Sequence, residues 1–322
     1  MKYIRKPNIF IFLTLFLCVV VRGALLPASF YGAEFVTESY QIVLFVSKNI
    51  RPYVEAVDGL RDQLDKSIDA DVEVIMLDRY TEKARADLAD RVIGDSDVDL
   101  VAAIGPEAAA FVWETFQDAA FSRIYSIILN PEKVIGQIES VPGISLNIPP
   151  AEQLHVIHRG LSSVTRIGIF YDPAYNSDFY AKALEATFEI DVDLVPLSVS
   201  SKKDIPFLLE ECWDSIDCVW LIPDRTVISE SIAQYIIKQA VLKKVPVVGY
   251  NQFFYDSGAA MAFVFDYEDL GRQSAGLITD VLQQKASGAR APVFKVWLNE
   301  TVLEKLDIEI PKPIELPMMV GP

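Results

Sequence analysis

Polar residues that follow apolar, strand-like runs are the best candidates for chemistry in this sequence. In open parallel sheets, the loops beyond the carboxyl ends of the strands meet in one crevice, where their side chains can contact a common ligand. That rule selects the following residues: Ser47, Lys48, Gly105, Pro106, Glu107, Asn130, Asn176, Ser177, Asp224 and Asn251. Amides, hydroxyls and single charges of this kind predict hydrogen bonding to a small polar ligand.

Two of these positions indicate a particular ligand group. Asp224 directly follows an apolar run, CVWLIP, so its carboxylate is placed to bind an ammonium group; alternatively, it caps its own turn or pairs with Arg225. Gly105 and Pro106 begin a predicted helix whose free backbone N–H groups attract an anion. The same two residues also fit an ordinary strand-to-helix turn, and the carboxylate of Glu107 would compete with a bound anion.

Other candidates also have two interpretations. Asn176 and Ser177 either hydrogen-bond a ligand or cap a helix predicted at residues 178–188. Tyr250 either forms a wall of the pocket or belongs to the core, where aromatic rings are common. Whether each of these residues contacts a ligand depends on which residues surround it in the folded protein.

Signs of catalysis or metal binding are few. Glu152, His155 and His158 are spaced three residues apart on a predicted helix, which would allow a metal pair, although polar residues near a helix start commonly face solvent. The sequence contains no Walker-type phosphate loop, no dinucleotide-binding glycine motif after the first strand and no nucleophile elbow. We therefore expect no enzymatic activity, no metal and no cofactor.

Alternating strands and helices must position these residues. Apolar strand cores are predicted at residues 41–47, 71–77, 100–104, 125–129, 166–171, 192–197, 218–222, 245–250, 260–265 and 293–298. Amphipathic helices are predicted between them, at about 52–64, 81–93, 151–161, 178–188, 204–213, 229–242, 267–284 and from residue 106. This alternation is typical of α/β folds, and the chain is long enough for two doubly wound, Rossmann-like lobes.

The predicted lobes share the chain unevenly. We expect residues 36–146 and 267–289 to form the N-terminal lobe, residues 147–266 and 290–315 the C-terminal lobe, and residues 316–322 an extended tail. Three segments would cross between the lobes, at residues 145–149, 265–267 and 289–293. Crossings of two or three strands form a hinge.

The first residues predict export. Basic residues precede an apolar run at residues 9–21 that is short for a membrane span, which is typical of a secretory signal peptide. We place the signal peptide at residues 1–23, with cleavage possible up to about residue 33; the alternative is an uncleaved anchor. Cys212 and Cys218 would then enter an oxidising compartment, either as a disulfide or as two buried thiols.

The net charge of the chain disfavours some classes of binding partner. The formal net charge is −16, and removing residues 1–23, which carry four basic and no acidic side chains, takes it to −20. Such a field repels nucleic acid and anionic lipid. The charge therefore disfavours binding to nucleic acid or a membrane surface, and we expect a monomer that binds a small molecule.

Motifs over nearly the whole chain resemble the substrate-binding proteins of ABC transporters, in the group that includes binders of tryptophan and other aromatic amino acids. The matching segments are IGPEAAAF, LNP at residues 129–131, PGISLNIPPAEQL, RIGIFYDPAYNS, WLIPDRTV, VPVVGYNQ, SGAAMAFVFDYEDLGRQSAGL and LNETVLEKLDIEIP. The resemblance implies the type I periplasmic-binding-protein fold. It also implies solute capture in the periplasm and delivery to an inner-membrane ABC permease and its ATPase.

The resemblance also implies ligand residues. The positions that match family pockets are Ser47, Pro106, Glu107, Asn147, Asn176, Ser177 and Asp224. The first-strand loop departs from the amino-acid binders, because SKNIRPY brings two basic side chains there. A sensory or partner-binding protein of the same fold, without transport, is the alternative function.

Overall fold

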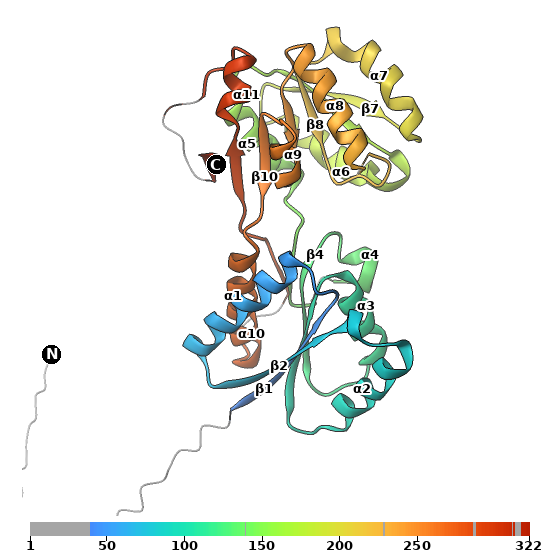
Figure 1. Ribbon diagram of the computed structural model, residues 1–322, viewed down its shortest axis with the longest axis vertical. Coiled ribbons are helices and arrows are strands. Elements are labelled where there is room, and N and C mark those ends of the chain that lie inside the picture. The colour runs from blue at the N-terminus through green and yellow to red at the C-terminus, as the bar shows by residue number, and fades with distance from the viewer. Residues whose placement is uncertain (1–38, 139, 228, 286–287, 311, 313–316) are drawn as a thin grey trace, which may run out of the picture. The chain divides into compact units, whose positions relative to one another are not determined.

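The computed structural model describes residues 39–138, 140–227, 229–285, 288–310, 312 and 317–322. The predicted signal peptide lies outside these residues. Within them, the strands form two separate sheets, each covered by helices on both faces (Figure 1). No helix in the described ranges is long and apolar enough to span a membrane.

The first sheet has the order β11-β5-β4-β3-β1-β2, and all its pairs are parallel. Its strands are β1 (Tyr40–Val46), β2 (Ala70–Met76), β3 (Val98–Ile104), β4 (Ser122–Ile128), β5 (Gly143–Ser145) and β11 (Ala289–Arg290). Strands β1 and β3 each end in five consecutive buried residues, as expected where helices cover both faces of a parallel sheet.

Two helix pairs cover this sheet. One face packs against α1 (Arg51–Ser67) and α10 (Tyr267–Leu282), and the other against α2 (Glu82–Gly94) and α3 (Pro106–Thr115). Successive residues of β1 divide between the two faces, because strand side chains alternate: Leu44 joins the first cluster and Phe45 the second. A single turn of helix, α4 (Glu132–Ile135), follows β4.

Helices α1 and α10 lie side by side with their backbones in contact (Figure 1). A Cβ atom placed on Gly59 would lie 2.1 Å from the Glu268 carbonyl oxygen, and one on Gly271 would lie 2.0 Å from that of Ala56. Only glycine permits so close an approach. These two glycines therefore allow α10, a helix from late in the chain, to pack closely against α1 of the first sheet.

The second sheet has the order β13-β12-β10-β9-β8-β6-β7. Its strands are β6 (Arg166–Tyr171), β7 (Asp193–Ser198), β8 (Cys218–Leu221), β9 (Val247–Gly249), β10 (Met261–Val264), β12 (Lys295–Leu298) and β13 (Met318–Val320). All pairs are parallel except β10 with β12, which is antiparallel. Residues in the segment predicted as an extended tail thus form an edge strand.

Helices again cover both faces of the second sheet. Helices α5 (Pro150–Gly160), α6 (Pro173–Thr187) and α11 (Glu300–Lys305) pack on one face, and α7 (Ile205–Cys212), α8 (Glu230–Leu242) and α9 (Gln252–Asp256) on the other. Cys212 and Cys218 are both buried free thiols, so the disulfide is absent. Burial raises the pKa of the Cys212 thiol to about 11, which keeps it protonated and unreactive.

The predicted start of one helix was wrong. Helix α6 begins at Pro173 and not at residue 178, because Asp172 caps it by accepting a hydrogen bond from the Ala174 backbone N–H at 2.9 Å. Proline is well suited to the first helical position. Asn176 and Ser177 therefore lie within the helix and do not cap it.

Candidate functional site

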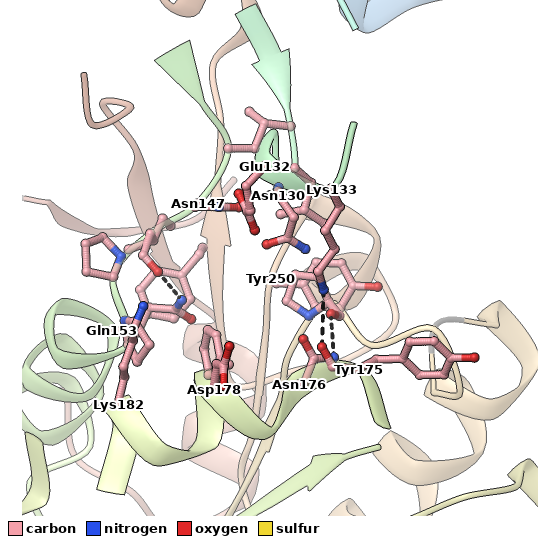
Figure 2. A pocket seen from close by; sticks show the side chains of 18 of the residues that line it. Asn130, Glu132, Lys133, Asn147, Gln153, Tyr175, Asn176, Asp178, Lys182 and Tyr250 are labelled. Carbon is pink, nitrogen blue, oxygen red and sulfur yellow. Dashed lines mark hydrogen bonds between the residues drawn. The ribbon is translucent and has the colours of Figure 1, made fainter. Parts of the chain in front are cut away.

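A cavity of about 720 Å³ lies between residues of the two sheets (Figure 2). The first sheet contributes residues after β4 and β5, and the second contributes the first turns of α5 and α6 and the ends of β8, β9 and β10. The polar and charged lining residues include Asn130, Glu132, Lys133, Asn147, Gln153, Asn176, Ser177, Asp178, Lys182 and Asn251. Six predicted residues, Asn130, Asn147, Asn176, Ser177, Tyr250 and Asn251, are therefore brought together.

Asn147 and Asn130 form a unit on one wall of the cavity. The Asn130 backbone N–H donates to Asn147 Oδ1 at 3.0 Å, and Asn130 adopts a left-handed conformation with φ of 51°. Asparagine tolerates that conformation better than most residues. Since the amide oxygen of Asn147 is occupied, its NH₂ group is the part left for a ligand, and it offers hydrogen-bond donors.

Asn176 presents the opposite group. Its Nδ2 donates to Asp224 Oδ2 at 2.7 Å and lies 3.4 Å from the Pro223 carbonyl oxygen, both of which only accept hydrogen bonds. The backbone of Asn176 departs from helical geometry, with φ of −131° inside α6. With its NH₂ directed to the protein, Asn176 leaves its Oδ1 as an acceptor at the cavity wall.

Asp224 lies behind this wall and is fully buried. Besides Asn176, its carboxylate accepts from the Asp172 backbone N–H at 2.8 Å and from the Thr226 backbone N–H at 2.8 Å. It therefore caps its own turn, one of the two interpretations of the sequence. Asp224 is absent from the cavity lining, so its direct contact with an ammonium group stays a prediction.

A second carboxylate accompanies Asp224. Asp172 is 6% exposed, and its Oδ2 accepts from the Thr226 hydroxyl at 2.7 Å. Neither carboxylate forms a salt bridge within the described residues. Two buried carboxylates close together, stabilised by hydrogen bonds and without a cation, give this end of the cavity a negative potential.

Tyr250 and Asn251 follow β9 on the same side of the cavity. Burial, followed by the charge of Asp224, raises the pKa of the Tyr250 phenol, so the hydroxyl stays protonated and can donate. Its ring lies 4.4 Å from that of Phe254, centroid to centroid. The Oδ1 atom of Asn251 is buried without a partner among the described residues and is available as a further acceptor.

The remaining predicted residues form a separate cluster at the ends of β1 and β3. Ser47 accepts from the Ala108 backbone N–H at 2.9 Å, and Lys48 pairs with Glu107 at 2.5 Å. Gly105 has φ of 88°, and a Cβ atom there would meet Ser47 and Tyr53. Neither this cluster nor Pro106 lines the cavity, so their ligand roles stay predictions.

The Lys48–Glu107 pair shifts the pKa values of both its groups. Its hydrogen bond raises the pKa of Lys48, while burial works against ionisation of Glu107 but is outweighed by Lys48, which holds the pKa of Glu107 below its ordinary value. Both groups therefore stay charged. The Glu107 side chain thus has its own cation at the start of α3, where the sequence suggested an anion site.

Several lining residues escaped prediction because they lie within helices and not in the loops that precede them. They are Gln153, Tyr175, Asp178, Phe179 and Lys182, together with Glu132 and Lys133 beside Asn130. The rule of strand-end loops selects residues before a helix starts. A search for polar residues in the first two turns of α5 and the first three turns of α6 would have found Gln153, Asp178 and Lys182.

The Glu152, His155 and His158 motif on α5 is not arranged as a metal site. His155 Nε2 lies 3.7 Å from Glu189 Oε2; the Glu189 side chain is largely exposed and the His155 side chain is partly exposed. In the part of the chain that the structure describes, no group of three or more His, Cys, Asp or Glu side chains is arranged to hold a metal ion.

Comparisons with known proteins identify the family of this chain. Residues 41–316 match the family described as ABC transporter substrate binding protein. The chain belongs to this family. A tyrosine-binding protein of Clostridioides difficile (strain R20291) is 22% identical over 236 residues, which cover 69% of this chain and 66% of that protein, slightly less than two thirds of its length.

Solved structures share the fold at low sequence identity. A ligand-free, open substrate-binding protein with adhesive properties from Clostridium difficile has a TM-score of 0.72 at 17% identity and covers 88% of this chain and 100% of that one. An ABC domain in complex with L-Trp from Streptococcus pneumonia has a TM-score of 0.56 at 19% identity, covering 85% and 96%. The predicted two-sheet periplasmic-binding-protein fold is confirmed.

Proposed function

We propose that this protein is the extracytoplasmic solute-binding component of an ABC transporter and that its ligand is an amino acid. The ligand binds in the cavity between the two sheets, shifts a hinge towards a closed form and is delivered to a membrane permease and its ATPase. Export by the N-terminal signal peptide places the protein in the periplasm. The protein acts as a monomer and performs no catalysis.

The opposite orientation of two cavity amides is the observation that carries this proposal. Asn147 uses its oxygen within the protein and offers its NH₂, whereas Asn176 uses its NH₂ and offers its oxygen. A free amino acid has a carboxylate that needs donors and an ammonium that needs acceptors. The two walls therefore match the two ends of a zwitterion.

Buried charge supports the same orientation. Asp172 and Asp224 lie behind Asn176 without a cation, so their potential favours a positive group in front of it. The ammonium group of the ligand then faces Asn176 and its carboxylate faces Asn147. Asp224 acts through Asn176 in this arrangement, by fixing which atom of the amide faces the ligand.

Aromatic rings support an aromatic ligand side chain. The cavity is also lined by Tyr175, Phe179, Tyr250, Phe263, Phe265 and Tyr267. Aromatic rings pack favourably against one another in offset or edge-to-face arrangements. The names of the tyrosine-binding relative and of the structural neighbour with bound L-Trp agree with this chemistry.

Hinge closure follows from the distribution of the contacts. Asn147 belongs to a segment after the first sheet and Asn176 to a helix of the second, so one ligand that touches both favours the arrangement in which both are in reach. Lys133 of α4 already donates to the Tyr175 carbonyl oxygen at 3.2 Å across the cavity. The predicted crossings at residues 145–149, 265–267 and 289–293 would bend.

Calorimetry on the processed protein tests this proposal. The protein, beginning near residue 34 and washed free of bound solute under mild denaturation, is titrated with each of the twenty common L-amino acids. We expect saturable binding of at least one aromatic L-amino acid. The control variant Lys238→Met changes an exposed side chain outside the cavity lining and should bind equally well. Absence of binding to every amino acid would contradict the proposal.

A further inference from the structure

Gln153 is a buried polar side chain on the cavity wall that the proposed zwitterion site does not use. It is 5% exposed and lies in the first turn of α5. Its Nε2 donates to the Ile148 carbonyl oxygen at 2.8 Å. Since a carbonyl only accepts, this bond fixes the amide orientation and leaves Oε1 as the free acceptor. No donor among the described residues contacts that oxygen atom.

The chain holds Gln153 rigidly. Pro149 and Pro150 stand at the start of its helix, four and three residues before it, and its backbone N–H donates to the Pro149 carbonyl oxygen at 3.0 Å. Proline fixes the backbone angle φ, so the first turn of α5 has little freedom. The position of Oε1 is therefore set before any ligand arrives.

Lys182 lies on the same side of the cavity. Both residues line the cavity, and in Figure 2 both lie towards one side of the view, whereas Asn176 and Tyr250 lie towards the other. Lys182 is on α6, six residues after Asn176; its side chain is exposed and makes no salt bridge within the described ranges. This side of the cavity therefore combines one free acceptor with one free donor.

We propose that Gln153 and Lys182 form a specificity site for a hydroxyl group at the far end of the ligand side chain. This inference rests on the proposed amino-acid function and adds the substrate class, a phenol such as that of tyrosine. A hydroxyl both donates and accepts, so it satisfies Gln153 Oε1 and Lys182 Nζ together. A phenyl ring satisfies neither, an indole N–H only the first, and a carboxylate only the second.

Matched ligands and variants test the site. L-tyrosine, L-phenylalanine and L-tryptophan are titrated into the wild-type protein, Lys182→Met, Gln153→Met and the control Lys238→Met. We expect the wild type to bind L-tyrosine about tenfold or more tightly than L-phenylalanine, as for hydrogen bonds that involve a charged group. Lys182→Met and Gln153→Met should each remove most of this ratio by weakening L-tyrosine alone, and Lys238→Met should keep it.

The outcomes separate this inference from the proposed function. Equal affinity of the wild type for L-tyrosine and L-phenylalanine, or a ratio unchanged in Lys182→Met, overturns the hydroxyl site while amino-acid binding stands. Tighter binding of L-tryptophan than of L-tyrosine also overturns it. Loss of binding for all three ligands in the wild type means that the proposed function itself has failed. Thermal melts of each variant show whether Gln153→Met has kept the fold.

Discussion

Asn176 shows how an uncharged side chain can be oriented by a buried carboxylate behind it. Its amide group is nearly symmetrical in shape but not in chemistry, and the shorter of its two hydrogen bonds, to the carboxylate of Asp224, is the main contact that turns the oxygen towards the cavity. If Asp224 acts in this way, its removal should affect both the fold and the ligand.

Replacing Asp224 with Asn tests this directly. The new NH₂ group must take the place of Oδ1, where it faces the Thr226 backbone N–H, or of Oδ2, where it faces the Asp172 backbone N–H and the Asn176 amide. All of these partners are donors, so at least one buried hydrogen bond is lost, and the negative charge that attracts the Asn176 NH₂ group is removed. We expect stability to fall by about 2 to 3 kcal/mol and amino-acid affinity to fall about tenfold. Urea unfolding and calorimetry measure the two effects.

Asp178→Asn provides the matched control. Asp178 lines the same cavity and carries the same charge, but no hydrogen bond to its carboxylate occurs within the described residues. If long-range charge alone mattered, both variants would weaken ligand binding to the same extent. A larger loss in Asp224→Asn supports the orienting role, and equal losses would contradict it.

Asp217 is expected to make stability depend on pH. Hydrogen bonds from Arg166, at 2.6 Å, and from Thr165 hold the pKa of this carboxyl below its ordinary value. The contribution of Asp217 to the free energy of unfolding is therefore present above the ordinary carboxyl pKa. It is lost as the pH falls through the lowered pKa of the folded protein. Because solvent screens the pair, we expect Asp217→Asn to cost only about 1 kcal/mol at pH 7.

Urea unfolding of Asp217→Asn at pH 7 and at pH 2 checks this sign. The difference from the wild type should be present at pH 7 and should shrink at pH 2. Asp307→Asn is the control, since Asp307 pairs with Lys244 on the exposed surface and should show no measurable change. A difference that grows on acidification would show that Asp217 acts by another route.

At the scale of elements, periodicity predicted most strands and long helices to within a few residues. The start of α6 was wrong because two capping signals occur close together, and local pattern did not reveal that Asp172 rather than Asn176 forms the cap. The edge strand β13 was predicted only as an extended tail, since pairing with β12 is a long-range contact. Gln153 was missed for a related reason: whether a helical side chain faces a cavity depends on what packs opposite.

The contact between α1 and α10 gives a prediction for the elements. Gly271→Ala would place a Cβ atom 2.0 Å from the Ala56 carbonyl oxygen, and two backbones cannot relax as a side chain can. We expect a loss of about 3 kcal/mol in stability, at the upper end of overpacking effects. Urea unfolding monitored by tryptophan fluorescence measures this loss.

Gly276→Ala is a control on the same helix. A Cβ atom at Gly276 meets nothing within 4 Å, so the substitution should be neutral or stabilise the protein by up to about 1 kcal/mol through helix propensity. Similar losses for both glycines would show that helix propensity, and not the close approach of α1, explains the effect.

At the scale of the whole molecule, the two-sheet fold was predictable because each α/β unit has a local sequence pattern, in which apolar strands alternate with amphipathic helices. Half of the predicted site residues line the cavity, for example Asn130 and Asn251, because strand ends converge by topology. Ser47 and Asp224 do not, because exposure at a strand end depends on the neighbouring side chains. Asp224 is covered by the residues that it orients.

Ligand-induced closure is the prediction for the whole molecule. Small-angle X-ray scattering should show a smaller radius of gyration when the bound amino acid is present at saturation, because the ligand joins groups from both sheets. Asn147→Leu removes one of the two amides, so this variant should bind weakly and stay at the wild type's ligand-free radius. An unchanged scattering profile at saturation would refute closure.

The late position of α10 in the chain has a consequence for biosynthesis. The first sheet begins at Tyr40, but one of its covering helices ends at Leu282 and its edge strand at Arg290. A nascent chain that has not reached these residues leaves one face of the sheet without α10, and this half of the protein cannot be completed early. If the proposed signal peptide directs export of the chain before it folds, this delay helps to keep the chain unfolded until it has crossed the membrane.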